Sequence, residues 1–265
     1  VAYILDHSDC KVFIVDRQFH NVVVDALAQV DREITVIDID DKQAGLGDIP
    51  AIGKLEYESF LETGDEGFEW IRPDDEWQAI SLSYTSGTTG NPKGVVYHHR
   101  GSYLMSMGSI SAWNMPNRLT YLYTVPMFHC NGWGYPWTLA MLHARVIFIR
   151  NIVVKEIFEL IDEYDVTHFG GAPIVLNMIA NAPAEDQKAL KNKVYVMTAG
   201  APPPSSILQK MESLGFEVMH VYGLTETYGH VVHCAGNKDW NSLAEDKRSE
   251  LKAYQGVRYP HTEMV

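Results

Sequence analysis

Short apolar runs alternate with amphipathic helical patterns along this sequence, and this alternation limits the fold more than any other feature. Residues 11–16 form an apolar run, apolar residues then recur at helical spacing from Phe19 to Val30, and a second apolar run covers residues 34–38. Two apolar runs joined by a helical stretch are typical of a strand–helix–strand unit with parallel strands. The sequence therefore predicts an α/β fold, in which large, twisted, mostly parallel sheets are flanked by helices.

The same alternation continues through the rest of the chain. An acidic, glycine-rich stretch at residues 41–75 interrupts it, and a subdomain split is expected near residue 150, where the pattern is irregular. We expect strands at residues 79–84, 146–149, 194–198 and 217–222, and helices after Arg100 and at residues 56–62, 153–164 and 205–214.

The charge balance is acidic, because 34 Asp and Glu residues oppose 21 Lys and Arg residues and give a formal net charge of −13. An acidic chain without a basic stripe is a poor partner for nucleic acid or for an anionic membrane. No apolar run reaches the roughly 18–20 residues that cross a bilayer, so we expect no transmembrane segment. Cys10, Cys130 and Cys234 show no CxxC spacing, which predicts a reducing compartment, the cytoplasm or an organelle matrix.

A glycine- and hydroxyl-rich loop at residues 85–94 directly follows a predicted strand. Its glycines let backbone N–H groups converge on an anion, and its lysine adds a positive charge suited to phosphate. Lys93 follows Pro92 and precedes Gly94, which is not the order of a Walker A loop. The loop favours a polyphosphate ligand, and the alternative is a plain surface turn. Its candidate residues are Thr85, Ser86, Gly87, Thr88, Thr89, Gly90 and Lys93.

Residues 222–227, Tyr-Gly-Leu-Thr-Glu-Thr, stand at the end of another predicted strand, where open α/β sheets bind ligands. The Tyr222 ring can stack on a purine, the Thr225 hydroxyl can donate to a phosphate, and the Glu226 carboxylate suits Mg²⁺. Taken alone, a Thr-Glu pair is more often a helix start. Residues 198–204 combine small residues with prolines, so they can form a backbone wall for a flat ring or a helix N-terminus.

Residues 84–94 resemble the signature loop of the adenylate-forming, AMP-binding superfamily, which includes acyl- and aryl-CoA synthetases, firefly luciferase and peptide-synthetase adenylation domains. Residues 222–227 and 198–204 are similar to two further segments of that superfamily. The resemblance implies catalytic roles for Thr88, Lys93, Glu226 and His129, and a metal site at Thr85 and Glu226. Besides the loop, it implies nucleotide contacts from Gly200, Ala201, Pro202, Tyr222, Gly223 and Thr225.

The resemblance also implies a pocket for the substrate acid. His129 and Trp133 lie in a segment similar to the one that closes the acyl pocket in the superfamily, and Gly170 and Gly171 lie where pocket residues are expected. The alternatives are ordinary packing for the two rings and a strand-to-helix turn for the glycines.

Two other pairs of reactive side chains are expected to have structural rather than chemical roles. Cys130 adjoins His129, but neighbours on an extended segment point to opposite faces, so a Cys–His nucleophile pair is not expected. His98 and His99 are adjacent without a third ligand at helical spacing, which is weak support for a zinc site.

The implied activity is ATP-dependent activation of a carboxylic acid to an acyl-adenylate, followed by thioester formation with CoA. ATP, Mg²⁺ and CoA are therefore the expected cofactor and co-substrates, and a homodimer of the full-length enzyme is compatible with the resemblance. Residues 127–133 and 257–260 look most like medium-chain acyl- and aryl-CoA ligases, including the methylthiopropionate-activating type.

The resemblance covers only the middle of a superfamily member. The ribose-binding Asp, the hinge and the C-terminal lobe with its catalytic Lys have no counterpart in the sequence. We therefore expect residues 1–265 to be a partial N-terminal AMP-binding domain, an internal fragment that is impaired in turnover.

Three alternatives to a CoA ligase remain open at this point. One is an adenylation domain that loads a carrier protein, and another is a nucleotide-binding module without catalysis. The third is an amidase-type hydrolase that would use Ser86 and Lys93, but it would leave residues 222–227 without a role.

Overall fold

The computed structural model describes residues 1–86 and 90–263, and it divides into two compact units. Unit 1 comprises Val1–Asp74 and Tyr84–Gly94, and unit 2 comprises Asp75–Ser83 and Val95–Val265. Residue 150 lies inside unit 2, and the subdomain split expected near that residue stays a prediction.

Unit 1 is built on a small sheet, which within the described residues has three parallel strands in the order β1–β2–β3. Val15, Val23 and Val36 form its core, and the predicted strand–helix–strand unit is confirmed. The elements are α1 (Ala2–His7), β1 (Val12–Asp16), α2 (His20–Leu27), β2 (Thr35–Ile39), β3 (Leu55–Glu56) and α3 (Tyr57–Leu61), with 3-10 turns at Arg17–Phe19 and Lys42–Ala44.

A buried carboxylate ties the loop after β2 to this sheet. Asp38 is 1% exposed, and its oxygens accept hydrogen bonds from the backbone N–H groups of Ile52 at 2.9 Å and Gly53 at 3.0 Å. Arg17 donates to the same carboxylate at 3.3 Å. Because the carboxylate is paired on several sides, it can stay buried at the end of β2.

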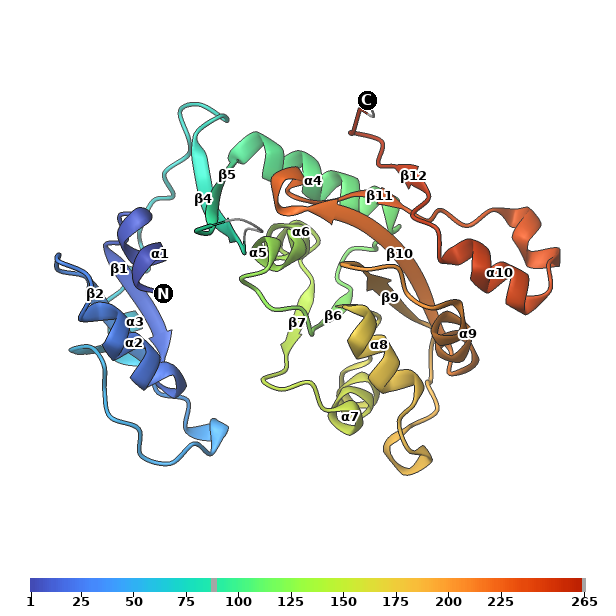
Figure 1. The fold of residues 1–265 in the computed structure, drawn as a ribbon, viewed down its shortest axis with the longest axis horizontal. Coiled ribbons are helices and arrows are strands. Elements are labelled where there is room, and N and C mark those ends of the chain that lie inside the picture. Colours follow the sequence, from blue (N-terminus) through green and yellow to red (C-terminus); the bar gives the residue numbers. More distant parts are fainter. Residues whose placement is uncertain (87–89, 264–265) are drawn as a thin grey trace. The chain divides into compact units, whose positions relative to one another are not determined.

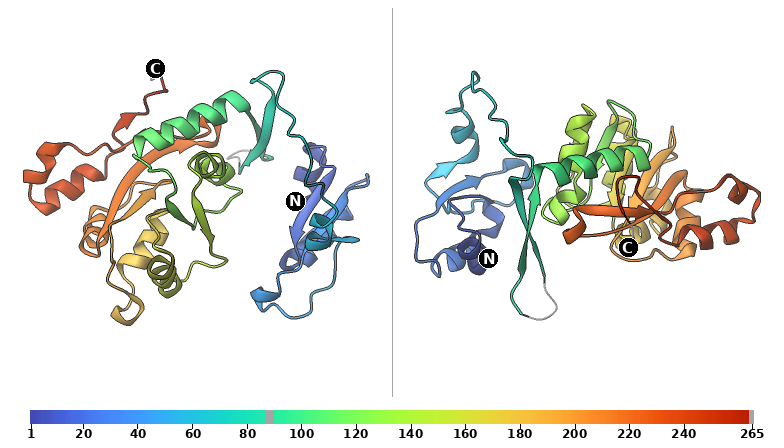
Figure 2. Two further views of the ribbon diagram at one scale, coloured as in Figure 1. Left: turned by 180° about the vertical axis from the view of Figure 1, so that it is seen from behind. Right: turned by 90° about the horizontal axis from the view of Figure 1, so that it is seen from above.

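β4 (Ala79–Thr85) and β5 (Lys93–His98) pair as a separate two-stranded sheet, which appears as a twisted ribbon in Figure 2. The strand at β4 was predicted, and β5 was not. His98 ends β5, and its ring nitrogen accepts the N–H of Gly101 at 2.9 Å. This bond caps α4 (His99–Ala112), so His98 has a structural role here.

Unit 2 contains a larger, mixed sheet. Within the described residues its strand order is β12–β11–β10–β9–β8–β6–β7 (Figure 1). The strands from β10 to β7 pair in parallel, and β11 and β12 add an antiparallel edge. The strands are β6 (Thr120–Tyr123), β7 (Arg145–Phe148), β8 (His168–Gly171), β9 (Val194–Thr198), β10 (Phe216–Leu224), β11 (Gly229–His233) and β12 (Val257–Arg258).

Helices cover this sheet, and the strands predicted at residues 146–149, 194–198 and 217–222 are present within two residues at each end. The fold class predicted from the sequence is confirmed. The helices are α4, α5 (Cys130–Trp133), α6 (Tyr135–Met141), α7 (Val154–Tyr164), α8 (Pro173–Ala180), α9 (Ser205–Ser213) and α10 (Glu245–Lys252), with 3-10 turns at Ala184–Asp186, Thr225–Thr227 and Lys238–Ser242.

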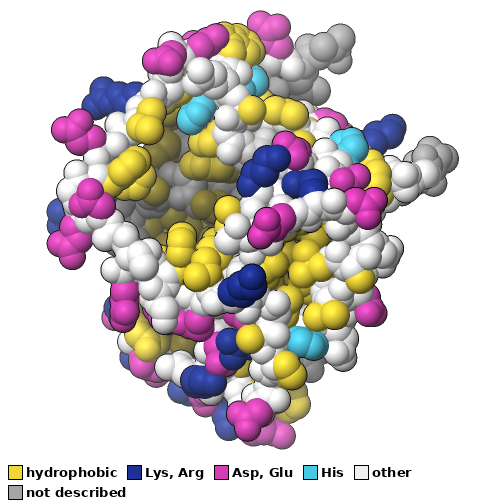
Figure 3. Space-filling view, turned by 90° about the vertical axis from the view of Figure 1, so that its left-hand side faces the viewer, with side chains coloured by type: hydrophobic (Ala, Val, Ile, Leu, Met, Phe, Trp, Pro, Cys, Tyr) yellow, Lys and Arg dark blue, Asp and Glu magenta, His cyan; other side chains and the backbone are white. Residues whose placement is uncertain are grey.

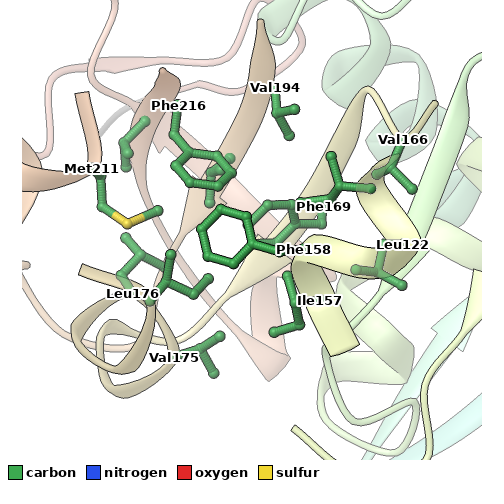
Figure 4. Packing of buried hydrophobic residues seen from close by; sticks show 14 of the residues in the cluster. Leu122, Ile157, Phe158, Val166, Phe169, Val175, Leu176, Val194, Met211 and Phe216 are labelled. Carbon is green, nitrogen blue, oxygen red and sulfur yellow. The ribbon is translucent and has the colours of Figure 1, made fainter. Parts of the chain in front are cut away.

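Alternate residues of the parallel strands enter different cores, as the two-residue period of a strand requires. Leu122 packs with α7, α8 and α9, whereas its neighbours Tyr121 and Tyr123 pack with residues of α6. Figure 4 shows the first core, in which Phe216 meets Phe158 and Phe169 with ring centroids 5.9 Å apart in each pair. The sheet is therefore buried on both faces, so a ligand can reach it only at the ends of its strands or at its edge strands.

Charged and hydrophobic side chains both lie on the surface. Acidic and basic side chains are interspersed on the face drawn in Figure 3, with hydrophobic side chains between them. Among residues 1–86 and 90–263, no helix combines the length and apolar character that spanning a bilayer requires.

Candidate functional site

The parallel strands of unit 2 bring several predicted residues to one edge of the sheet. Thr198, the last residue of β9, lies opposite Gly171 of β8 and His220 of β10. The segments that follow Gly171 and Thr198 therefore leave the sheet at the same edge, and β10 continues beyond it. In open α/β sheets, ligands bind outside the carboxyl ends of the strands, so this edge is the candidate site.

β10 continues past this edge and turns back into β11. The turn between them is the 3-10 segment Thr225–Thr227. Thr227 holds it closed, because its hydroxyl accepts the N–H of Leu224 at 2.9 Å and donates to the carbonyl of Gly229 at 2.8 Å. The predicted residues Tyr222 and Glu226 are exposed, and Thr225 is half-buried. Glu226 forms no ion pair with another described residue, so its carboxylate is available to a ligand.

Gly223 has a structural reason to be glycine. It follows a bulge in the β10–β11 pair, and a Cβ at this position would lie 1.7 Å from the carbonyl oxygen of Gly229. Any side chain would push the two strands apart. The nucleotide role that the resemblance implies for Gly223 is compatible with this requirement and stays a prediction.

The segment after β9 is open to solvent. Gly200 has a left-handed φ of +93°, and apart from its chain neighbours no described residue lies within 4 Å of its absent Cβ. Ala201 and Pro202 are exposed. β9 and β10 are neighbouring parallel strands. The wall expected at residues 200–202 and the ring of Tyr222 therefore extend from adjacent strands.

The segment with His129 and Trp133 has an unusual backbone. Cys130, Asn131, Gly132, Trp133 and Gly134 all have positive φ, between 44° and 75°. α5 is therefore a left-handed turn. Left-handed geometry costs a residue other than glycine roughly 1–2 kcal/mol, and such strain persists only where the surroundings enforce it.

Buried groups on two other strands hold this turn in place. Tyr123 of β6 donates to the carbonyl of Gly132 at 2.9 Å, and Ser83 of β4 donates to the side-chain oxygen of Asn131. A Cβ on Gly132 would lie 2.0 Å from the Tyr123 hydroxyl. The turn therefore needs glycine at position 132 and a hydrogen-bond donor beneath it.

The left-handed turn also corrects one assumption about Cys130. The segment was expected to be extended and is instead left-handed, and the Cys130 sulfur lies 3.4 Å from the Thr225 hydroxyl. Burial raises the pKa of the Cys130 thiol, so the group stays protonated near neutral pH and suits a contact better than a nucleophile.

Trp133 and Gly170 are brought together, and His129 is not buried with them. A Cβ on Gly170 would lie 3.3 Å from the Trp133 ring and 3.0 Å from Val125. A Cβ on Gly171 would instead meet Leu176 at 3.0 Å. Trp133 is 5% exposed, whereas His129 is exposed.

His230 of β11 also packs against Trp133. The two rings meet edge-to-face with centroids 4.8 Å apart. Burial lowers the pKa of His230 to about 3, and neither ring nitrogen has a hydrogen-bond partner among the described residues. His230 is therefore a neutral packing group at working pH, and no sequence pattern pointed to it.

Part of the glycine- and hydroxyl-rich loop at residues 85–94 belongs to unit 1. Thr85 ends β4, Ser86 follows it, and Gly90 has a left-handed φ of +107°. Lys93 begins β5 and is exposed. Inside unit 1, Tyr3 donates to the carbonyl of Pro92 at 3.2 Å. Three of the predicted loop residues, Gly87, Thr88 and Thr89, lie outside the described residues.

The described residues do not form a metal site by themselves. No group of three or more His, Cys, Asp or Glu side chains among them could hold a metal ion. Mg²⁺ is commonly bound through one or two carboxylates together with substrate phosphates and water. Glu226, an exposed carboxylate beside the Thr225 hydroxyl in sequence, fits that kind of site.

A hollow of about 700 Å³ lies elsewhere on unit 2. It is lined by Leu190, Lys191 and Lys193, which precede β9, and by Leu214 and Gly215, which precede β10. Those are the amino ends of the parallel strands, opposite the edge with the candidate residues. The hollow is therefore not the candidate site.

Taken together, the fold and the site define an α/β protein with exposed polar and aromatic residues at the carboxyl edge of a mostly parallel sheet. The family described as AMP-binding enzyme matches residues 1–265, so the chain belongs to the AMP-binding enzyme family.

Similar proteins support this assignment. The chain is 45% identical over 276 residues to a peroxisomal acetate/butyrate–CoA ligase of Arabidopsis thaliana, a match that covers 100% of the chain and 48% of that protein. It is 44% identical to an acetate–CoA ligase and 42% identical to a 2-methylpropanoate–CoA ligase, both of Humulus lupulus, over 98% and 97% of the chain and 48% and 47% of those proteins. The chain thus spans about half the length of these relatives.

Solved structures share the fold. A luciferase-like enzyme from Zophobas morio superposes with a TM-score of 0.73 at 18% identity, over 88% of this chain and 52% of that one. A fatty acyl CoA synthetase of Mycobacterium tuberculosis superposes with a TM-score of 0.70 at 24% identity, over 88% of this chain and 43% of that one.

Proposed function

We propose that the protein contributes the nucleotide and acid sites of an AMP-forming acid–thiol ligase. The proposal depends most on the Thr225–Thr227 turn, which presents Glu226 at the carboxyl edge of the sheet, exposed and without an ion pair to another described residue. Membership of the AMP-binding family and the CoA-ligase names of the relatives support it.

The proposed reaction has two halves. In the first, a carboxylate oxygen attacks the α-phosphorus of ATP, and the bond to pyrophosphate breaks. In the second, the thiol of CoA loses its proton and attacks the acyl carbonyl, and AMP leaves. Both reactants of the first half are anions, so the site must offset their charge and align them.

Residues of the chain divide this work in the proposal. Lys93 and the loop amides hold the phosphates, the Thr225 hydroxyl donates to a phosphate oxygen, and Tyr222 packs on the adenine against residues 200–202. Glu226 and Thr85 would hold Mg²⁺, which supplies positive charge at the phosphates. His129 stays assigned to the border between the acid and CoA sites.

We propose a small carboxylic acid as the substrate. Val125 and the Trp133 ring both lie within 3.3 Å of the position that a Cβ on Gly170 would take, so little room is left beside the backbone of β8 at this residue. The relatives named for acetate, butyrate and 2-methylpropanoate act on acids of this size by their names. All three cysteines are free, and we propose the cytoplasm or an organelle matrix as the location.

Calorimetry with a non-hydrolysable acyl-adenylate mimic and Mg²⁺ tests the nucleotide site. Glu226→Ala and Lys93→Ala should each weaken binding by about tenfold or more, because charge-assisted contacts contribute roughly 1.5–3 kcal/mol. Glu217→Ala and Lys193→Ala are matched controls, since these residues pair with each other at 2.9 Å on the opposite edge of the sheet.

Two outcomes of this experiment are informative. Binding that weakens in the first pair and not in the controls supports the site, and a panel of acids of increasing length then identifies the substrate in the full-length protein. Equal affinity in all four variants would mean that Lys93 and Glu226 do not contribute to binding of the nucleotide.

A further inference from the structure

Tyr97 links β5 to the turn that carries Thr225 and Glu226. The tyrosine lies four residues after Lys93 on β5 and is fully buried. Its hydroxyl donates to the carbonyl oxygen of Thr225 at 2.7 Å, across 128 residues of sequence. This contact lies within unit 2.

The Tyr97 ring also holds the far end of the turn. It stacks on Tyr228, the residue after the turn, with centroids 4.3 Å apart and an angle of 20° between the rings. Tyr228 has a left-handed φ of 65°, and its hydroxyl accepts the backbone N–H of His98 at 3.1 Å. A Cβ on Gly101 would lie 2.4 Å from the Tyr228 ring, so α4 packs tightly against this ring.

A third contact fixes the side chain of Thr225 itself. The Cys130 sulfur lies 3.4 Å from the Thr225 hydroxyl, and the left-handed turn that carries Cys130 is held by Tyr123 and Ser83. Thr225 is thus held through its carbonyl and its hydroxyl by two different elements, while the neighbouring Glu226 stays exposed.

We propose that Tyr97 is a positioning residue that sets the Thr225 hydroxyl and the Glu226 carboxylate for the phosphates of ATP and their cation. The inference rests on the proposed function. A small displacement of groups that bind a reacting phosphate weakens catalysis strongly. Burial raises the pKa of the Tyr97 hydroxyl, so it keeps its proton and donates to Thr225 throughout the working pH range.

The test is Tyr97→Phe in the full-length protein, because phenylalanine keeps the ring stack and removes only the hydroxyl. Tyr135→Phe is the matched control. Tyr135 is equally buried, and its hydroxyl donates to the sulfur of Met197 at 2.9 Å and not to the Thr225–Thr227 turn. The readouts are pyrophosphate release with varied ATP, varied Mg²⁺ and varied acetate or butyrate, together with the melting temperature.

The expected effect is selective for the nucleotide. Tyr97→Phe should lower kcat/KM for ATP by about tenfold, the loss equivalent to one hydrogen bond of roughly 1.4 kcal/mol, and should raise the Mg²⁺ concentration needed for half-maximal rate. The KM for the acid should change by less than about twofold, since no contact of the acid pocket is removed.

Several results would overturn the inference. Tyr97→Phe could match Tyr135→Phe in every constant, or it could lower the ATP and acid constants equally in step with the melting temperature, which marks a general structural defect. If Tyr97→Phe does not fold, Tyr228→Phe takes its place, and unchanged ATP and Mg²⁺ constants in that variant reject the inference. Failure of the proposed function is distinct, because the unsubstituted protein would then release no pyrophosphate with any acid.

Discussion

Gly132 shows how one residue determines the backbone of the site. Its φ is +61°, and a Cβ would lie 2.0 Å from the Tyr123 hydroxyl. Gly132→Ala should therefore lower the free energy of unfolding by about 2–4 kcal/mol, from left-handed strain together with the clash. Urea denaturation followed by tryptophan fluorescence measures this change.

Two further variants separate the causes. Gly236→Ala is the control, because apart from its chain neighbours none of residues 1–86 and 90–263 lies within 4 Å of its absent Cβ. It should change stability by less than about 0.5 kcal/mol. Adding Tyr123→Phe to Gly132→Ala should recover part of the loss by removing the clashing oxygen. A Gly132→Ala protein as stable as the Gly236→Ala protein would contradict the left-handed turn.

Single residues also show where sequence reasoning succeeds and where it stops. Tyr222 and Glu226 could be placed at a strand end, because a strand and the turn after it are local patterns. The contact of Tyr97 with Thr225 joins residues 128 apart, and no local pattern carries it. Only the glycines at positions 132 and 134 indicated in the sequence that the backbone is left-handed there.

At the scale of elements, the sequence predicted the buried parallel strands best. β9 lies at residues 194–198 as expected, because its run of apolar residues is buried on both faces. β5 and β11 were missed, since polar residues such as Lys93 and His233 stand at their ends and interrupt the apolar pattern. α10 was missed because its sequence is charged almost throughout, which leaves no apolar stripe.

The small sheet of unit 1 should depend on Asp38. Asp38→Ala would leave the N–H groups of Ile52 and Gly53 and the guanidinium of Arg17 without their shared partner. The local free energy of opening should fall by about 3 kcal/mol. Hydrogen exchange should therefore accelerate in peptides of residues 35–56, and peptides of residues 194–224 serve as the internal reference.

Asp25→Ala is the matched control, because Asp25 is an exposed residue of α2. Exchange in residues 35–56 that is equally slow in both variants would show that Asp38 does not hold the loop after β2.

At the scale of the whole molecule, buried histidines should make stability depend on pH. Burial lowers the pKa of His168 to about 4 and that of His230 to about 3, whereas an unfolded histidine titrates near 6.5. Between these values the unfolded chain binds more protons than the folded one. The stabilising contribution is therefore complete above about pH 6.5 and is lost as the pH falls toward 4.

The expected loss from His168 alone is about 3 kcal/mol by pH 4, since each unit of pKa shift corresponds to roughly 1.4 kcal/mol. The urea concentration at the unfolding midpoint, measured from pH 8 to pH 5, should decrease once the pH is below 6.5. Most carboxylates titrate only at lower pH. His168→Phe keeps an aromatic ring against Tyr195 and Trp113 and removes one titrating group. Its stability should therefore depend less on pH below 6.5, with pH 8 as the reference for both proteins. Midpoints that stay level from pH 8 to pH 5 in the unsubstituted protein would mean that these histidines are hydrated or paired in solution.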